Sequence, residues 1–214
     1  MSLLGRTPPD FSAARAAMVA LLRRRGIADE LVLAAMGAQP REDYVPRRLR
    51  AKAYEDRALA IGHGATISQP YVTAVMLEAL AVQHGDRVLE IGAGSGCVTA
   101  LLSALGAQVW SVELDADLHD AATERLNGVA EVTLRVGDGA LGWPEAAPFD
   151  ACLAAAAAEE IPPAWLEQLR PGGRLIAPVG RRSHQRLILV KRSSDDSPDI
   201  CTSLLPVRFV PLRR

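Results

Sequence analysis

Short apolar runs alternate with helical patterns through the middle of the chain. Runs typical of strands lie at 87–91, 108–112, 131–136, 150–155 and 174–179, and helical periodicity at 98–105, 116–126 and 164–169. Strands that alternate with helices form a parallel sheet, because each helix carries the chain back to the edge where the next strand starts. The pattern predicts an α/β fold with a mostly parallel sheet and helices on both faces.

The two ends of the chain depart from this alternation. Residues 10–26 and 29–36 have helical periodicity, whereas 38–70 has little periodicity and several prolines and glycines. We expect 38–70 to be a long irregular region, and ordered loops of that length usually carry function. Pro70 is expected to open a helix. The division that follows is an N-terminal helical segment with a substrate or lid loop, 1–70, and one compact ligand-binding unit, 71–214.

Near the C-terminus the pattern changes again. Residues 186–191 and 204–210 have the composition of strands, with a polar turn at 193–199 and no helical pattern between them. Two strands joined by a turn pair antiparallel. The sheet is therefore expected to have an antiparallel edge.

The overall charge and the cysteines exclude several classes of protein. The 214 residues carry 24 basic and 25 acidic side chains, so nucleic acid is not an expected partner. Three cysteines without a CxxC pair argue against a zinc cluster and fit a reducing compartment. The longest apolar run, 8 residues, is far short of a membrane span, and the N-terminus does not resemble a signal peptide. We expect a cytoplasmic protein that binds neither membrane nor metal.

A glycine loop, Glu90-Ile-Gly92-Ala-Gly94-Ser95-Gly96-Cys97, stands between a predicted strand and a predicted helix. Glycines there let the backbone approach a ligand closely at the helix N-terminus. The dinucleotide fingerprint GxGxxG would need glycine at 97, so the spacing favours S-adenosylmethionine over NAD. Glu90 either contacts the amino-acid part of this cofactor indirectly or ties neighbouring loops together.

Two further candidate cofactor ligands follow the next two predicted strands. Glu113 ends one strand, where a carboxylate can accept hydrogen bonds from both ribose hydroxyls. Asp138, beside Gly139, ends the other and can accept from an adenine amino group. The alternatives are a solvated helix cap for Glu113 and a turn for Asp138. Three features at successive strand ends predict one site in the crevice where open α/β sheets bind ligands.

Longer segments carry a resemblance to a known family. They are PREDYVP at 40–46, YEDRALAIGHGATISQPY at 54–71, GDGALGWPEAAPFD at 137–150, EEIPPAWLEQLRPGGRLIAPVG at 159–180 and FVPL at 209–212. With the ExGxGxG loop, which is similar to that of class I methyltransferases, the chain resembles the protein-L-isoaspartate O-methyltransferase family over nearly its whole length. The resemblance implies a Rossmann-like class I methyltransferase sheet.

The resemblance also implies an activity and a substrate loop. The methyl group of S-adenosylmethionine would pass to the free carboxylate of an L-isoaspartyl residue in a protein or peptide, leaving S-adenosylhomocysteine and an ester that collapses to a succinimide for repair. Ser68 would be the active-site residue, with Ala65, Thr66 and Ile67 closing over substrate and cofactor. His63 either binds the substrate carboxylate or is a turn residue. A monomer is expected.

Several departures from the family pattern leave the substrate open. They are Cys97, the alanine-rich turn AAAAAEE and the terminal Arg213-Arg214. An alternative is a peptide-tailoring methyltransferase that esterifies one aspartate of a precursor peptide to form an aspartimide. A non-catalytic cofactor-binding scaffold and a small-molecule methyltransferase are weaker alternatives.

The chemistry needs few catalytic groups. A carboxylate is already ionised at neutral pH, so the nucleophile requires no general base. Ser68 is then expected to orient the carboxylate through one hydrogen bond. A serine-hydrolase function is not supported, because Ser68 does not lie in a GxSxG motif.

Overall fold

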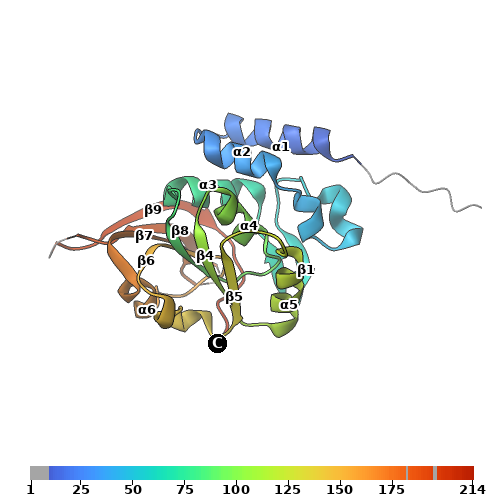
Figure 1. The fold of residues 1–214 in the computed structure, drawn as a ribbon. Helices are drawn as coiled ribbons and strands as arrows, with labels where there is room; N and C mark the ends of the chain where they lie inside the picture. Colours follow the sequence, from blue (N-terminus) through green and yellow to red (C-terminus); the bar gives the residue numbers. More distant parts are fainter. Residues whose placement is uncertain (1–9, 182, 195–196) are drawn as a thin grey trace, which may run out of the picture.

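A seven-stranded sheet in the order β5-β4-β3-β6-β7-β8-β9 forms the centre of the protein (Figure 1). The structure, a computed structural model, describes residues 10–181, 183–194 and 197–214. The strands from β5 to β7 are parallel, and β8 and β9 continue the sheet antiparallel. Their bounds are β3 Arg87–Ile91, β4 Gln108–Glu113, β5 Val132–Val136, β6 Phe149–Ala154, β7 Leu169–Val179, β8 Gln185–Lys191 and β9 Ile200–Val207. The predicted parallel sheet with an antiparallel edge is confirmed.

The described part of the chain contains six α-helices. They are α1 Ser12–Arg24, α2 Glu30–Ala38, α3 Pro70–Leu80, α4 Cys97–Ala104, α5 Ala116–Arg125 and α6 Pro163–Glu167. Local sequence explains several of their starts. Asp29 and Asp115 cap α2 and α5 by accepting backbone N–H bonds, and Pro70 stands in the first turn of α3. Figure 1 shows α1 and α2 stacked outside α3, away from the sheet.

The sheet separates two hydrophobic cores, because successive strand residues point to opposite faces. In β3, Val88 belongs to the larger core with α1, α2, α3 and α4, whereas Leu89 belongs to the smaller core with Trp165 of α6. The larger core also contains Met18 and Leu22 of α1. The described part of the N-terminal segment, residues 10–70, therefore shares a core with the sheet, and the division at residue 70 stays a prediction.

The region 38–70 is more ordered than the sequence predicts. It contains the 3-10 helices η1 Arg41–Tyr44 and η2 Arg47–Lys52 and the hairpin of β1 Leu59–Gly62 with β2 Ala65–Ile67. Gly62, His63 and Gly64 all have positive φ, which makes the tight turn between the two short strands. The expectation of a purely irregular region was wrong, because strands of three and four residues are too short to show alternation.

Other boundaries moved by a few residues. β7 begins at Leu169, where helix was expected, and β9 spans 200–207 instead of 204–210. Residues 209–212 leave the sheet and run beside Ala157, whose N–H donates to the Val210 carbonyl. The predicted turn at 193–199 includes residues 195 and 196, which lie outside the described residues.

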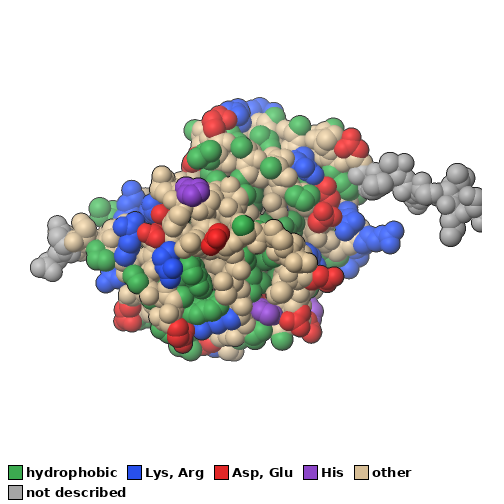
Figure 2. All heavy atoms as spheres, in the orientation of Figure 1, with side chains coloured by type: hydrophobic (Ala, Val, Ile, Leu, Met, Phe, Trp, Pro, Cys, Tyr) green, Lys and Arg blue, Asp and Glu red, His purple; other side chains and the backbone are tan. Residues whose placement is uncertain are grey.

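The distribution of charged side chains on the surface agrees with the nearly equal numbers of acidic and basic residues in the sequence. Figure 2 shows acidic and basic side chains intermingled over the face drawn in Figure 1. Within the described residues, no helix is both long enough and apolar enough to span a bilayer.

Candidate functional site: a cofactor pocket and its substrate loop

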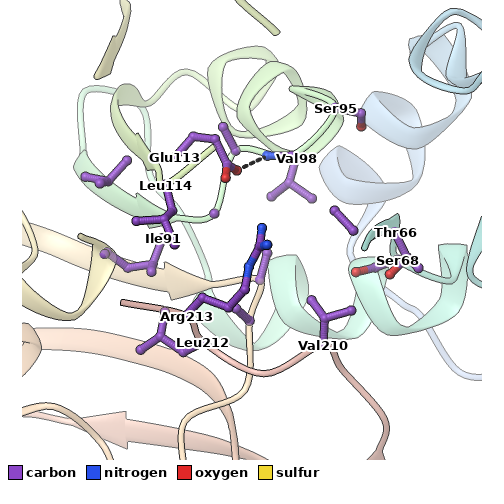
Figure 3. Close-up of a pocket in the computed structure, with 18 of the residues that line it drawn as sticks. Thr66, Ser68, Ile91, Ser95, Val98, Glu113, Leu114, Val210, Leu212 and Arg213 are labelled. Carbon is purple, nitrogen blue, oxygen red and sulfur yellow. Dashed lines mark hydrogen bonds between the residues drawn. The ribbon is translucent and has the colours of Figure 1, made fainter. Parts of the chain in front are cut away.

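A pocket opens at the carboxyl ends of β3, β4 and β6, and it encloses about 750 Å³ including its mouth (Figure 3). Parallel α/β sheets bind ligands at this edge, because the loops that leave neighbouring strands diverge there. The glycine loop, the end of β4, strand β2 and the C-terminal segment 210–213 contribute its walls. Segments far apart in the sequence thus meet at one cavity.

The glycine loop forms one wall with its backbone. Gly92, Gly94 and Gly96 have φ of 88°, 55° and 84°, a region that side-chain-bearing residues rarely adopt. Gly92, Gly94 and Ser95 line the pocket, whereas Gly96 lies beneath them against Leu126 and Ala122 of the α5 region. The loop therefore presents main chain to a ligand at the start of α4, as the sequence predicts.

Glu113 is held in place at the pocket wall. Its Oε2 accepts from the Gly94 N–H at 2.8 Å, and its Oε1 accepts from the Asp115 N–H at 3.0 Å. The side chain is buried, and each oxygen keeps a lone pair for a ligand hydroxyl. A fixed carboxylate beside a glycine backbone and apolar walls fits the ribose of S-adenosylmethionine.

Glu90 lies under the loop and does not line the pocket. Its Oε2 accepts from Thr99 Oγ1 of α4 at 2.6 Å and from Ser111 Oγ of β4 at 2.7 Å, and its Oε1 is buried without a hydrogen bond. Burial raises the pKa of Glu90 to about 7. These contacts join β3 to β4 and α4, which resembles the tie between neighbouring loops considered from the sequence. The indirect contact of Glu90 with the cofactor stays a prediction.

Asp138 and Gly139 differ in their relation to the pocket. Gly139 lines it, and an added Cβ there would stand 2.6 Å from Ile91 Cγ2. The Asp138 carboxylate caps η3 Gly139–Leu141 by accepting from the Ala140 N–H at 2.8 Å. It does not reach the pocket wall in this arrangement, and its adenine contact stays a prediction.

The predicted substrate loop forms part of the pocket wall. Ala65, Thr66, Ile67 and Ser68 all line it, and Figure 3 places Ser68 and Thr66 together at one side. A buried arginine fixes this loop: Arg41 of η1 donates from Nη2 to the Ser68 carbonyl at 2.6 Å and from Nε to the Ala53 carbonyl at 2.7 Å. Sequence reasoning did not single out Arg41, because an arginine in an irregular segment gives no periodic signal.

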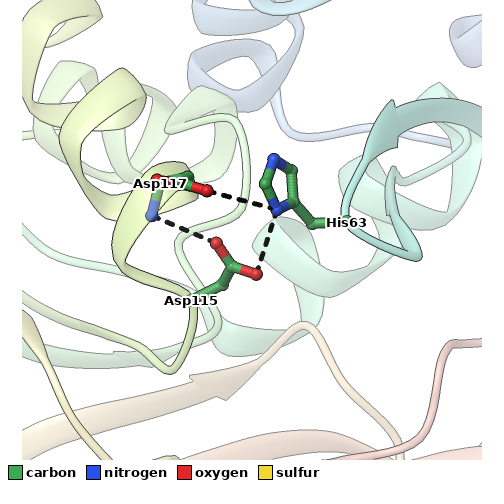
Figure 4. A group of neighbouring side chains, drawn as sticks. All are labelled: His63, Asp115 and Asp117. Atoms are coloured by element: carbon green, nitrogen blue, oxygen red, sulfur yellow. Dashed lines mark hydrogen bonds and ion pairs between the residues drawn. The ribbon is translucent and has the colours of Figure 1, made fainter.

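His63 lies apart from the pocket at the tip of the β1–β2 hairpin. Its Nδ1 stands 3.2 Å from Asp115 Oδ2 and 3.8 Å from Asp117 Oδ2 at the start of α5 (Figure 4). The Asp115 pKa is lowered, first by the backbone hydrogen bond from Leu118 and also by the charge of His63. These contacts link the hairpin tip to α5, whereas a contact of His63 with substrate stays a prediction.

The potential ligand atoms of His63, Asp115 and Asp117 all lie within 4.8 Å of one another, close enough to hold a cation. Exposed carboxylates beside a histidine are common without an ion, so they do not by themselves indicate a metal site. The expectation that the reaction uses no metal stays a prediction.

Arg213 is a pocket residue that the sequence analysis treated only as a departure from the family pattern. Leu212 N–H donates to the Ala157 carbonyl at 2.7 Å, which fixes the backbone just before Arg213. Its guanidinium points into the pocket in Figure 3. Among the described lining residues, only Glu113 and Arg213 are charged, so this cavity has an anionic and a cationic group. A guanidinium there can pair with a carboxylate.

Comparisons with known proteins agree with this geometry. Residues 13–214 match the family model described as Protein-L-isoaspartate(D-aspartate) O-methyltransferase (PCMT). A protein-L-isoaspartate O-methyltransferase of Anaeromyxobacter dehalogenans is 50% identical over 198 residues, 91% of this chain and 95% of that protein. A second protein-L-isoaspartate O-methyltransferase, from Methylorubrum extorquens, is 50% identical over 208 residues, which are 96% of this chain and 91% of that protein.

A solved structure adds the cofactor class. It is a beta-aspartate methyltransferase (PCMT) from Plasmodium falciparum in complex with S-adenosyl-L-homocysteine. It superposes with a TM-score of 0.81 at 25% identity and covers 93% of this chain and 98% of that one.

Fold, pocket and comparisons together define a class I S-adenosylmethionine-dependent methyltransferase. Within that class, the chain belongs to the protein-L-isoaspartate O-methyltransferase family. The alternative of a dedicated peptide-tailoring enzyme is not favoured, because relatives at 50% identity carry the isoaspartate name.

Proposed function

We propose that this chain repairs isoaspartyl residues of proteins by methyl transfer in the pocket beside Ser68. The observation that carries the proposal is the meeting of the TIS segment, 66–68, with the glycine loop and Glu113 at one cavity. When bound, S-adenosylmethionine supplies a methyl group on a positively charged sulfur. The residues around it have to bind, orient and exclude water.

Each wall of the pocket has a separate task in this proposal. Glu113 accepts the ribose hydroxyls, and the backbone of Gly92 and Gly94 allows close approach of the cofactor. Ser68 donates one hydrogen bond to a substrate carboxylate oxygen and leaves the other oxygen to attack in line. Arg213 attracts the negatively charged substrate, because it is the cation among the described lining residues.

Positioning is expected to supply most of the rate. The carboxylate is ionised at neutral pH and needs no base, so the barrier depends on distance, angle and hydration. The hairpin β1–β2 stands close to the glycine loop, since an added Cβ at Gly94 would lie 3.5 Å from Ile61 Cδ1. Such a cover removes water from the carboxylate, which strengthens its attraction to a cation.

The test offers labelled S-adenosylmethionine to an isoaspartyl peptide and to its aspartyl isomer, with mass spectrometry of the products. We expect methylation of the isoaspartyl peptide and little of its isomer. Ser68→Ala should lower kcat/KM by roughly 10- to 100-fold, the value of one hydrogen bond to a charged group. Ser183→Ala, an exposed serine outside the pocket, is the control. Methylation of both isomers alike, or an undiminished Ser68→Ala variant, would contradict these assignments.

A further inference from the structure

A second cavity, about 1160 Å³ including its open side, lies beside the cofactor pocket, and we name it the flank groove. Its walls come from segment 56–58, the start of α3 and segment 205–209. Thr66 and Ser68 line both the flank groove and the cofactor pocket. A peptide in this groove would thus pass directly beside the residue that we propose to hold the reacting carboxylate.

The flank groove has an excess of positive charge. Its charged lining residues are Arg25, Arg57, Arg208 and Asp56, which gives a net charge of +2. A concave surface with one sign of charge attracts the opposite charge from solution. The whole chain, by contrast, has a net charge of −1, so the sign is local to this surface.

The single acidic group in the groove is already satisfied. Asp56 forms an ion pair with Arg25, and its carboxylate also accepts from the Tyr71 N–H at 2.9 Å and from Gln69 Nε2 at 3.0 Å. Arg25 in turn lies over the Tyr71 ring, 3.5 Å from its centroid. This pair forms a fixed part of the wall, and the excess charge belongs to the two other arginines.

Arg57 and Arg208 are exposed and can contact a ligand. Arg57 pairs with Glu55 at 2.6 Å, but about half of each side chain is open to solvent, and such surface pairs are weak. No ion pair among the described residues involves Arg208. A carboxylate from a bound peptide can therefore engage either guanidinium at little cost.

We propose that the flank groove binds the peptide chain next to the reacting isoaspartyl residue and favours substrates with acidic flanking residues. This rests on the proposed function of the Ser68 site. The groove accounts for a preference among isoaspartyl peptides, whereas the cofactor pocket accounts for the reaction itself.

The experiment compares three isoaspartyl peptides of equal length whose flanking positions carry two glutamates, two glutamines or two lysines. Each exposed ion pair changes an equilibrium by a factor of about 1.5 to 5. Across the two arginines, kcat/KM should be about tenfold higher for the glutamate peptide than for the lysine peptide at low salt. The ratio should fall towards one near about 0.5 M salt, where the screening length is only a few ångströms.

Charge reversal locates the effect. The double variant Arg57→Glu with Arg208→Glu should reverse the order of kcat/KM between the glutamate and lysine peptides. The matched control is Arg47→Glu with Arg48→Glu, which makes the same change of net charge on exposed residues outside the groove. That control should keep the wild-type preference.

The outcomes separate the two proposals. Equal kcat/KM for all three peptides would overturn the proposal that the flank groove selects acidic flanking residues. The proposed methylation function would still stand. An equal loss of preference in the control variant would also overturn the proposal for the groove, since the effect would then be one of overall charge. Methylation of none of the peptides would overturn the proposed function and the groove with it.

Discussion

Removal of the charge at Glu90 should make the protein more tolerant of alkaline pH. The carboxylate is fully buried, and burial raises its pKa to about 7 from an ordinary value of 4.5. Only one of its oxygens accepts hydrogen bonds, from Thr99 and Ser111. A glutamine at this position keeps an oxygen for both donors and resembles the protonated acid, which also has a hydrogen on the other atom.

The size of the effect follows from the two pKa values. The folded state binds the Glu90 proton more tightly than the unfolded chain does. The stabilisation that this proton gives the folded state is therefore fully present below pH 4.5 and is lost as the pH rises through about 7. This stabilisation of the folded state amounts to about 3 kcal/mol at 1.36 kcal/mol per pKa unit, and about 2–3 kcal/mol of it is lost between pH 5 and pH 8.

Urea unfolding of the wild type and Glu90→Gln at both pH values, without cofactor, measures this loss. The free energy of unfolding of Glu90→Gln minus that of the wild type should rise by about 2–3 kcal/mol from pH 5 to pH 8, because the contributions of all other titrating groups cancel. Glu167→Gln, at an exposed helix position, should show no such rise. A constant difference for Glu90→Gln would refute the argument that Glu90 is protonated in the folded protein near neutral pH.

Three further substitutions test the pocket. Glu113→Gln should weaken S-adenosylhomocysteine binding by about 10- to 100-fold in calorimetry, because it removes a charged acceptor; Asp138→Asn should weaken it less, since that carboxylate caps η3. Arg213→Gln should raise the KM for an isoaspartyl peptide by roughly tenfold in initial-rate assays, and Arg214→Gln, outside the pocket lining, should not. Gly139→Ala should cost about 1–3 kcal/mol of unfolding free energy, because the new Cβ meets Ile91, whereas Gly137→Ala makes only ordinary contacts and should be nearly neutral.

The sheet was predictable because its strands carry strong local signals. β3 occupies 87–91 as expected, since a buried parallel strand is an apolar run bounded by polar residues and glycine. The hairpin β1–β2 was missed because its strands are short and include Gly62 and Ala65, which have little strand propensity. The long β7 was underestimated because Pro171 and two glycines interrupt its start.

Site residues could be predicted from the sequence only where they belong to a recognisable motif. The glycine loop and Glu113 meet at one pocket because β3 and β4 are neighbours in the sheet and their carboxyl ends lie side by side. Ser68 joins them from the separate β1–β2 hairpin and was found through its motif. Arg41 and Arg213 reach the site through tertiary packing, by a buried side chain and by a tail that crosses to Ala157. No local pattern encodes such contacts. The same holds for the charge of the flank groove, which combines residues from 25 to 209.

The attachment of Ser68 to Arg41 has a consequence for motion. At the base of the β1–β2 hairpin, a buried guanidinium grips the Ser68 carbonyl. At the tip, His63 meets Asp115 through a partly exposed pair, and pairs of this kind add little stability. We therefore expect the tip to open more readily than the base. Any opening that admits substrate is then expected at the tip, while Ser68, which we propose to orient the substrate carboxylate, stays fixed.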